Sequence, residues 1–255
     1  MDTEALQLEA ASALVKRLPG LSVFVPVWNE EGNLERVVTE LARAAAEVTD
    51  NYEIIIVNDG SQDRTGEIAS ELAARDQHIR VVHHPVNQGY GAAVTSGIRA
   101  SRMPYVMLCD GDGQFDAADM KLLICRIADY DVVVGRRKNR VEGFVRRLNG
   151  WAWSSLMRLL FGVESHDVDC GFKLFRREFL EGLQLKSRGA MISAELLAKL
   201  AGRGARVCEV DVRHLPRLTG KPTGASPRVI ARAFVELFAL ARELRAESAK
   251  RRRQL

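Results

Sequence analysis

The feature that most constrains the fold is a regular alternation of short apolar runs and longer helical segments between residues 21 and 135. Runs rich in β-branched residues, typical of buried strands, occur at 21–27, 53–59, 79–85, 105–110 and 131–135. Segments with apolar residues at helical spacing lie at 33–48, 65–75, 89–101 and 117–129. Short connections between such elements predict an α/β fold, a mostly parallel sheet with helices on both faces.

Beyond residue 135 the alternation is less regular, with a helix predicted at 192–202 and a strand at 207–212. Hydrophobic residues make up 47% of the chain and charged residues 27%, so a sizeable core can form. We expect three parts. These are an N-terminal helix within 1–20, an α/β domain over 21–227 and a basic amphipathic C-terminal helix within 228–255.

Two carboxylates at the end of one predicted strand give the strongest chemical signal. Asp110 and Asp112 flank a single glycine, and Gln114 follows two residues later. Carboxylates this close repel each other, and a divalent cation supplies the counter-charge. Because Mg²⁺ binds one or two carboxylates together with phosphate oxygens, the pattern predicts a Mg²⁺ or Mn²⁺ site. The alternative is a solvated turn, since Asp and Gly are ordinary turn residues.

Two further polar turns, 26–33 and 58–65, follow predicted strands. Asp59 could accept hydrogen bonds from a ribose or base, although a helix-capping turn would explain the second turn equally well. Glu30 lies near a helix start, where it could merely complement the helix dipole. Parallel strands end at one edge of a sheet, where ligands collect, so these turns and the 110–116 turn are expected to lie together.

A fourth loop carries Gly89 and Gly91 at the start of a small-residue helix. Backbone amides at a helix N-terminus bind phosphate, so we expect Gly89 to help hold a diphosphate. The spacing is not GxGxxG and no GKS or GKT triplet follows, which argues against a Rossmann dehydrogenase and a P-loop enzyme. His83 and His84 lack metal-ligand spacing and are interpreted as polar loop residues, and Glu195 as a surface or capping residue.

The order of five segments resembles family 2 glycosyltransferases with the GT-A (Rossmann-like) fold. The segments are VPVWNEE, VNDGSQDRT, NQGYGAA, DGDGQFD and DVDCGFKLFRRE, and the similarity runs from about Leu21 to Arg228. The DGDGQ form points to the dolichol-phosphate mannosyltransferase-like and polyprenyl-phosphate glycosyltransferases. The resemblance implies metal-dependent, inverting transfer of a sugar from a nucleotide-sugar donor to a polyprenyl phosphate.

The resemblance also implies roles for individual residues. The implied nucleotide contacts are Pro26, Asn29, Glu30 and Asp59. Asp110 is implied to bind both the nucleotide and the metal. The implied metal ligands are Asp110, Asp112 and Gln114. Asp167 opens the acceptor-side motif, which ends with Lys173 as an acceptor contact.

The acceptor decides which catalytic groups the reaction needs. A cation held by Asp110 and Asp112 would stabilise charge on the diphosphate leaving group. A hydroxyl acceptor also needs a general base, for which Asp167 and Asp169 are the candidates. A lipid phosphate is already an anion, and with that acceptor we expect Asp167 to position groups rather than remove a proton.

A basic stretch at 136–161 bears on the choice of acceptor. It contains Arg136, Arg137 and Arg146, interleaved with apolar residues that include Trp151. A basic helix with Trp, Phe and Leu on its other face is typical of an interfacial membrane helix, so these arginines are predicted to contact a lipid phosphate. A core helix with a solvated basic face is the alternative, and a soluble hydroxyl acceptor is the rival to the lipid.

Location and partners follow from the remaining features. The first ten residues lack a secretory signal pattern and no run of about 18 apolar residues occurs, which predicts a cytoplasmic protein, with peripheral membrane attachment left open. The four cysteines lack zinc-site spacing and are expected to be reduced. The net charge of +4 would also suit a nucleic-acid-binding module, but the acidic turns would repel a polyanion, so no nucleic acid is expected. A homo-oligomer and a membrane-protein partner both stay open.

Overall fold

The computed structural model describes residues 17–138, 155, 158, 165–217 and 242. Three predicted features lie outside these residues. They are the N-terminal helix within 1–20, most of the basic stretch at 136–161 with Arg146, and the C-terminal helix within 228–255.

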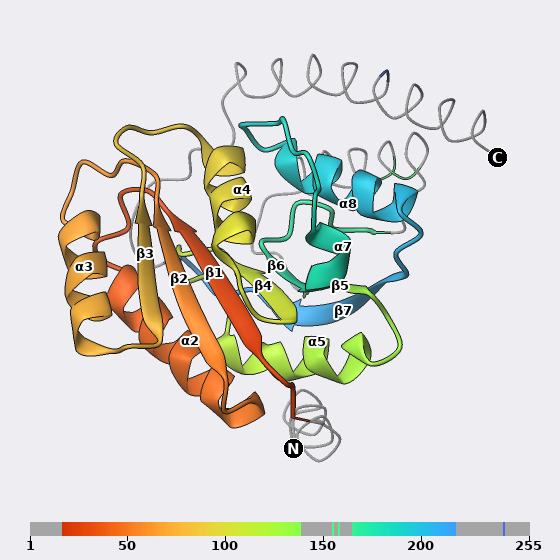
Figure 1. Ribbon diagram of the computed structural model, residues 1–255, viewed down its shortest axis with the longest axis horizontal. Helices are drawn as coiled ribbons and strands as arrows, with labels where there is room; N and C mark the ends of the chain where they lie inside the picture. Colours follow the sequence, from red (N-terminus) through yellow and green to blue (C-terminus); the bar gives the residue numbers. More distant parts are fainter. Residues whose placement is uncertain (1–16, 139–154, 156–157, 159–164, 218–241, 243–255) are drawn as a thin grey trace.

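The apolar runs form a seven-stranded sheet in the order β3-β2-β1-β4-β6-β5-β7 (Figure 1). The strands are β1 (Leu21–Val27), β2 (Tyr52–Asn58), β3 (Ile79–His83), β4 (Tyr105–Cys109), β5 (Val132–Lys138), β6 (Phe172–Arg176) and β7 (Val207–Arg213). Every residue of β1 is buried, because helices cover both faces of the central strands. Within the sheet only β6 runs against its neighbours, so the mostly parallel sheet is confirmed.

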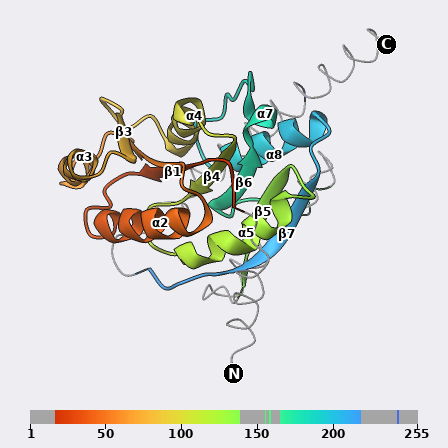
Figure 2. The same ribbon diagram turned by 60° about the horizontal axis from the view of Figure 1, so that its bottom comes forward.

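Helices connect the strands on both faces. They are α2 (Leu34–Val48), α3 (Thr65–Arg75), α4 (Tyr90–Ala100), α5 (Met120–Ile127), α7 (Arg177–Leu180) and α8 (Ile192–Gly202), with a 3-10 turn η1 (Ala117–Asp119) before α5. Figure 2 shows α4 and α8 on one face of the sheet and α2 and α5 on the other. The small residues of α4 allow a close approach, since a Cβ at Gly97 would overlap the ring of Phe24 in β1.

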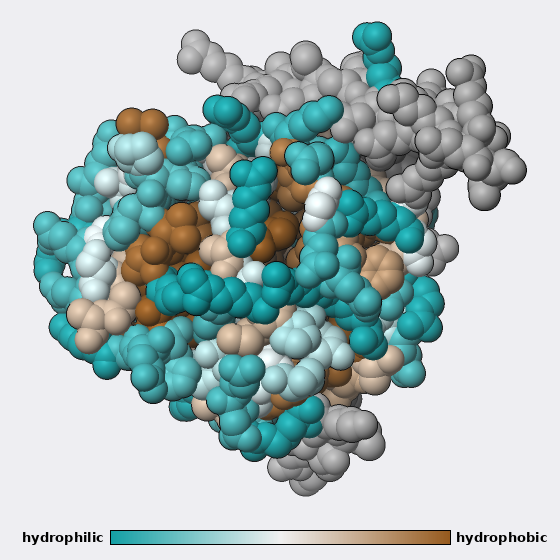
Figure 3. Space-filling model, viewed as in Figure 1, coloured by the Kyte–Doolittle hydropathy of each residue, from teal (hydrophilic) through white to brown (hydrophobic). Residues whose placement is uncertain are grey.

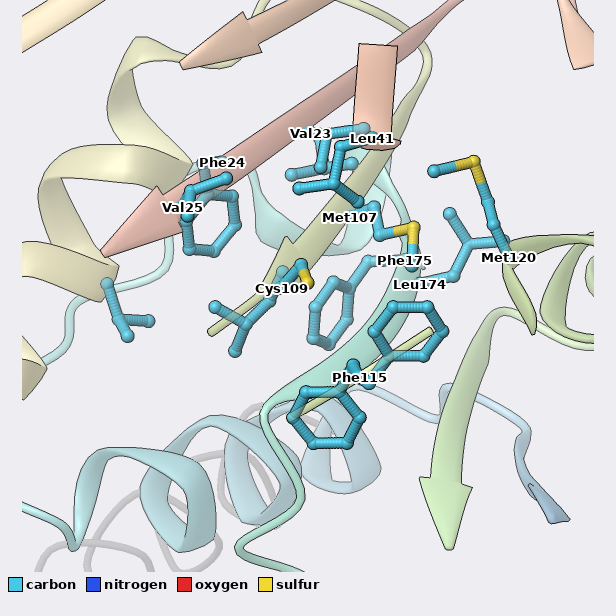
Figure 4. Close-up of a cluster of buried hydrophobic side chains, with 14 of the residues drawn as sticks. Val23, Phe24, Val25, Leu41, Met107, Cys109, Phe115, Met120, Leu174 and Phe175 are labelled. Carbon is cyan, nitrogen blue, oxygen red and sulfur yellow. The ribbon is translucent and has the colours of Figure 1, made fainter. Parts of the chain in front are cut away.

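The core lies between these layers and supports the edge where the polar turns meet. Figure 4 shows side chains of β1, β4 and β6, among them Phe24, Met107 and Phe175, packed in one cluster. Phe115, within the 110–116 turn, stacks on Phe172 of β6 with ring centroids 5.2 Å apart. This stacking ties the turn with the paired carboxylates to the core.

Two differences from the sequence-based expectations concern the region after residue 135. The strand β6 was not predicted, and it places the 167–171 segment at the same edge as the 110–116 turn. Arg136 and Arg137 do not belong to a helix, which corrects the predicted start of the basic helix at residue 136. They extend β5, where Arg136 pairs in register with Asp211 and Arg137 with Val212 of β7.

The described surface is mixed in character. Figure 3 shows a mostly hydrophilic face, with apolar side chains gathered on both sides of α4. In the described part of the chain, no helix is long and apolar enough to cross a bilayer. All four cysteines are free, as expected.

Candidate functional site

The strands bring the predicted polar turns to one edge of the sheet. The parallel strands β1, β2 and β4 end there, followed by the 28–33, 59–64 and 110–116 turns. Because β6 is antiparallel and Cys109 pairs with Phe172, the 167–171 segment reaches the same edge from the opposite chain direction. The 214–217 segment, which follows β7, also lies there, since the backbone amide of Leu215 donates to the carbonyl of Gln114 at 2.8 Å and the side-chain amide of Gln114 donates to the carbonyl of Leu215.

Asp110 lies at the centre of this edge and is held on two sides. Its backbone amide donates to the carbonyl of Gly171 at 3.0 Å. Its Oδ1 accepts a hydrogen bond from the hydroxyl of Tyr90 at 2.7 Å. Its Oδ2 lies so close to the Cα of Gly171 that a Cβ there would overlap the carboxylate. Only glycine fits at position 171 while Asp110 keeps this conformation.

The electrostatics of the pair suit a bound cation. Burial, followed by the charge of Asp112, raises the pKa of Asp110 from 3.8 to about 6. Among the described residues no group of three or more His, Cys, Asp and Glu side chains forms a complete cage for a metal. Two neighbouring carboxylates can nevertheless bind Mg²⁺ or Mn²⁺, because these ions take their further ligands from diphosphate oxygens and water.

Gln114 completes the predicted ligand set. Its Nε2 donates to the carbonyl of Leu215 at 3.2 Å, so the amide oxygen is the atom that can act as a ligand. Its backbone amide donates to Oδ1 of Asp112 at 3.1 Å. The turn thereby fixes Asp112 and Gln114 relative to each other.

The first turn places Glu30 in a buried position, where two neighbouring side chains contact its carboxylate. Glu30 is 9% exposed, accepts a hydrogen bond from Asn33 at 2.7 Å and forms an ion pair with Arg217. Burial raises its pKa against the lowering effect of these partners. Asn29 has φ 55° and accepts the amide of Gln62, which joins the first turn to the second.

The roles of Pro26 and Asp59 as nucleotide contacts stay predictions. Pro26 is a buried residue of β1. Asp59 is 3% exposed and is already bonded within the protein. It accepts the amides of Gln88 and Gly89 at 2.9 Å each and lies 2.7 Å from Nδ1 of His84. Asp59 thus holds the loop at 86–89 in place.

The predicted role of Gly89 in holding a diphosphate stays a prediction. The Gly89 amide donates to Asp59, and the Gly91 amide donates to the carbonyl of Arg188 at 2.9 Å. A Cβ at either glycine would overlap the backbone at 187–188, so that segment covers the start of α4. These two amides are therefore engaged inside the protein.

The acceptor-side residues form ion pairs. Asp167, a buried side chain, accepts two hydrogen bonds from the guanidinium of Arg137 at 2.8 Å each. Arg136 pairs with Asp211 at 2.6 Å, with both side chains substantially exposed. Asp169 is exposed at the same edge.

Lys173, predicted to contact the acceptor, lies inside the protein. Its side chain has 0% exposure, and its Nζ donates to the carbonyl of Cys170 and to the hydroxyl of Ser193. Burial lowers its pKa, while neighbouring acidic groups, Asp110 among them, raise it. The net effect is a lowered pKa, and Lys173 lies buried behind the carboxylates rather than open to an acceptor.

Three residues in the surroundings of the site were missed or misread from the sequence. The hydroxyl of Tyr90 contacts Asp110, which no local spacing indicates. His84 lies in the loop after β3, as predicted, but its side chain is only 8% exposed and bridges Asp59 and Ser96, which the sequence did not indicate. Glu195 is not at the surface, because it is 1% exposed and forms an ion pair with Lys199.

Comparisons with known proteins identify the family of this chain. Residues 22–183 match the model of a family described as glycosyl transferase family 2. The chain is 32% identical over 220 residues to the dodecaprenyl-phosphate galacturonate synthase of Rhizobium johnstonii, covering 84% of this chain and 63% of that protein. It is also 32% identical over 225 residues to the polyprenol monophosphomannose synthase of Mycolicibacterium smegmatis, covering 81% of this chain and 82% of that protein.

The fold is that of the GT-A glycosyltransferases. The chain is similar to glucosyl-3-phosphoglycerate synthase from Mycobacterium tuberculosis, solved with Mn²⁺, UDP-glucose and phosphoglyceric acid. The TM-score is 0.68 at 20% identity, over 92% of this chain and 82% of that chain. The same protein was also solved with Mg²⁺ and UDP, with a TM-score of 0.67.

Proposed function

Because this chain belongs to glycosyl transferase family 2, we propose that it transfers a sugar from a nucleotide-sugar donor to a polyprenyl phosphate. The observation that carries the reaction type is the carboxylate pair Asp110 and Asp112 at the ligand-binding edge of the sheet, with the raised pKa of Asp110. The acceptor class is proposed from the names of the relatives, two of which act on or make polyprenyl-linked phosphates. The galacturonate synthase is the longer protein, since the chain spans 63% of its length.

The acidic turn would bind the donor through a cation. Asp110 and Asp112, with the side-chain oxygen of Gln114, would hold Mg²⁺ or Mn²⁺ between them. When bound, this ion neutralises the diphosphate and stabilises the charge that builds up on the leaving oxygen. The nucleoside would lie against the first turn, where Asn29 and Glu30 are held by the neighbouring loop and by Arg217.

The acceptor side is arranged to position groups. In the proposed reaction the acceptor oxygen displaces the diphosphate in one inverting step. The carboxylate of Asp167 is engaged by Arg137, which suits holding that arginine beside the acidic turn better than removing a proton. A phosphate acceptor needs no strong base, and a fixed guanidinium recognises phosphate well.

The proposed acceptor also sets the proposed location. A polyprenyl phosphate carries its headgroup at a membrane surface, so the chain would act there, on the cytoplasmic face.

A donor screen with a mass readout tests the proposal. The purified chain is incubated with UDP- and GDP-linked sugars, Mn²⁺ or Mg²⁺, and a polyprenyl phosphate in detergent. We expect a polyprenyl-phosphate sugar whose formation stops when the metal is chelated. Asp112→Asn serves as the matched variant, and we expect transfer to fall by at least about a hundredfold while the fold is retained.

Two results would contradict parts of the proposal. Transfer only to a soluble alcohol, with the polyprenyl phosphate left unchanged, would refute the lipid acceptor and keep the enzyme class. Full activity of Asp112→Asn would refute the metal-binding role of the carboxylate pair.

A further inference from the structure

The hydroxyl of Tyr90 is placed against one of the two proposed metal-binding carboxylates. It donates to Oδ1 of Asp110 at 2.7 Å, and among the described residues it is the one hydrogen-bond donor to this carboxylate. The opposite oxygen lies against Gly171. We propose that Tyr90 is a positioning residue that sets the orientation of Asp110 for the divalent cation, an inference that rests on the proposed function.

The need for such a residue follows from the geometry of aspartate. Rotation about the bond to an aspartate carboxylate is broad, so the rotamer alone does not fix the plane of the two oxygens. In Asp110 the glycine at position 171 limits where Oδ2 can lie, and the Tyr90 bond fixes Oδ1. Outer groups that orient a ligating side chain in this way contribute strongly to metal affinity.

Tyr90 is itself held by the residues on either side of it. It is the first residue of α4, between two glycines whose amides are both bonded. The Gly89 amide donates to Asp59, and the Gly91 amide donates to the carbonyl of Arg188. The positive φ of 96° at Gly89 lets the chain turn into the helix at this point.

Both of these anchors are braced by buried contacts away from the ligand-binding edge. His84 connects Asp59 to the hydroxyl of Ser96, with distances of 2.7 and 2.9 Å. Glu195 accepts the amides at 186 and 187, next to Arg188, and pairs with Lys199 at 2.8 Å. The ring of Tyr90 is thus positioned before any ligand arrives, and its hydroxyl acts on Asp110 from a fixed point.

The alternative is that the hydroxyl only satisfies its own hydrogen-bonding need and serves stability. Tyr90→Phe separates the two roles, because it removes one oxygen and keeps the ring. Tyr105→Phe is the matched control, since it removes a tyrosine hydroxyl near Arg176 at the other end of β4. Asp112→Asn reports independently on the metal site.

The test is a Mn²⁺ titration of the full chain followed by thermal unfolding, in separate series with fixed UDP and fixed GDP. The readouts are the metal-free unfolding midpoint and the Mn²⁺ concentration that gives half of the ligand-induced rise in that midpoint. For Tyr90→Phe we expect this concentration to rise about tenfold. For Tyr105→Phe we expect the wild-type value, and for Asp112→Asn no rise.

The outcomes separate the inference from the proposed function. If Tyr90→Phe keeps the wild-type Mn²⁺ requirement while Asp112→Asn loses the response, Tyr90 has no positioning role and only this inference fails. A lower metal-free midpoint with an unchanged Mn²⁺ requirement would show a purely structural role and would also overturn it. If the wild type shows no Mn²⁺-dependent rise, or Asp112→Asn responds like the wild type, the metal site fails and the inference fails with it.

Discussion

Replacing Asp110 by Asn should stabilise the metal-free protein while removing its metal site. The Asp110 carboxylate is half-buried, and its loss of solvation together with the charge of Asp112 raises its pKa from 3.8 to about 6. Asn has nearly the same shape, carries no charge and can still accept the hydrogen bond from Tyr90. The substitution therefore removes an unfavourable charge at little cost in packing.

The size of the effect follows from the pKa. The difference between about 6 and 3.8 is about 2 pH units, which at ~1.4 kcal/mol per unit corresponds to at most ~3 kcal/mol. Between these two pKa values the folded state binds more protons than the unfolded state, so the stability of the metal-free wild type falls as pH rises from about 4 to about 6. Above about pH 6 the charged carboxylate destabilises the metal-free wild type by the full amount. Below about pH 4 both states are protonated and the cost disappears.

We expect Asp110→Asn to raise the free energy of unfolding by roughly 1–3 kcal/mol near pH 7.5, and by roughly a third as much near pH 4.5, in the presence of a chelator. Urea denaturation at a series of pH values measures this difference. Asp50→Asn is the control, because the Asp50 side chain is 94% exposed and should show no such pH-dependent gain. A loss of stability in Asp110→Asn that is equal at both pH values would refute the reasoning. So would a gain that does not grow with pH.

Three further predictions concern the residues around this carboxylate. Gly171→Ala should raise the Mn²⁺ requirement at least about tenfold, because the new Cβ would overlap Asp110; an unchanged Mn²⁺-dependent midpoint would contradict this. Glu195→Gln should lower the free energy of unfolding by about 3–5 kcal/mol in urea titrations, because it removes the negative charge that compensates the buried ammonium of Lys199. A change below about 1 kcal/mol would count against the ion pair. Lys173→Met should shift the acid limb of Mn²⁺ binding to higher pH, since the lysine charge lowers the pKa of Asp110, and an unshifted limb would show that Lys173 does not act on that carboxylate.

The ligand-binding edge could be predicted from the sequence because it depends on local patterns. Apolar runs mark β1, β2 and β4, and the turns after parallel strands must meet at one edge. The paired carboxylates in the 110–116 turn are likewise visible as a short motif. Each of these inferences uses residues within a few positions of one another.

The contacts that hold the edge in place could not be predicted in this way. Tyr90 and Asp110 are 20 positions apart, and His84 and Asp59 are 25 positions apart. Their meeting depends on how α4 lies across the sheet, which no spacing within either segment encodes. The strand β6 was missed because its sequence, FKLFR, carries Lys173 within the apolar run, and its partners β4 and β5 come earlier in the chain.

The acidic side chains at this edge differ in how far the protein itself satisfies them, and this difference marks the ligand-binding position. A buried carboxylate is costly unless hydrogen bonds or positive charge compensate it. Asp59 accepts hydrogen bonds from two backbone amides and lies against the ring of His84, so groups of the protein itself compensate its charge. Asp110 receives one hydroxyl from the described residues, and its loss of solvation, followed by the charge of Asp112, raises its pKa. A cation would supply the positive charge that Asp110 lacks, so a ligand gains more by binding at Asp110 than at Asp59.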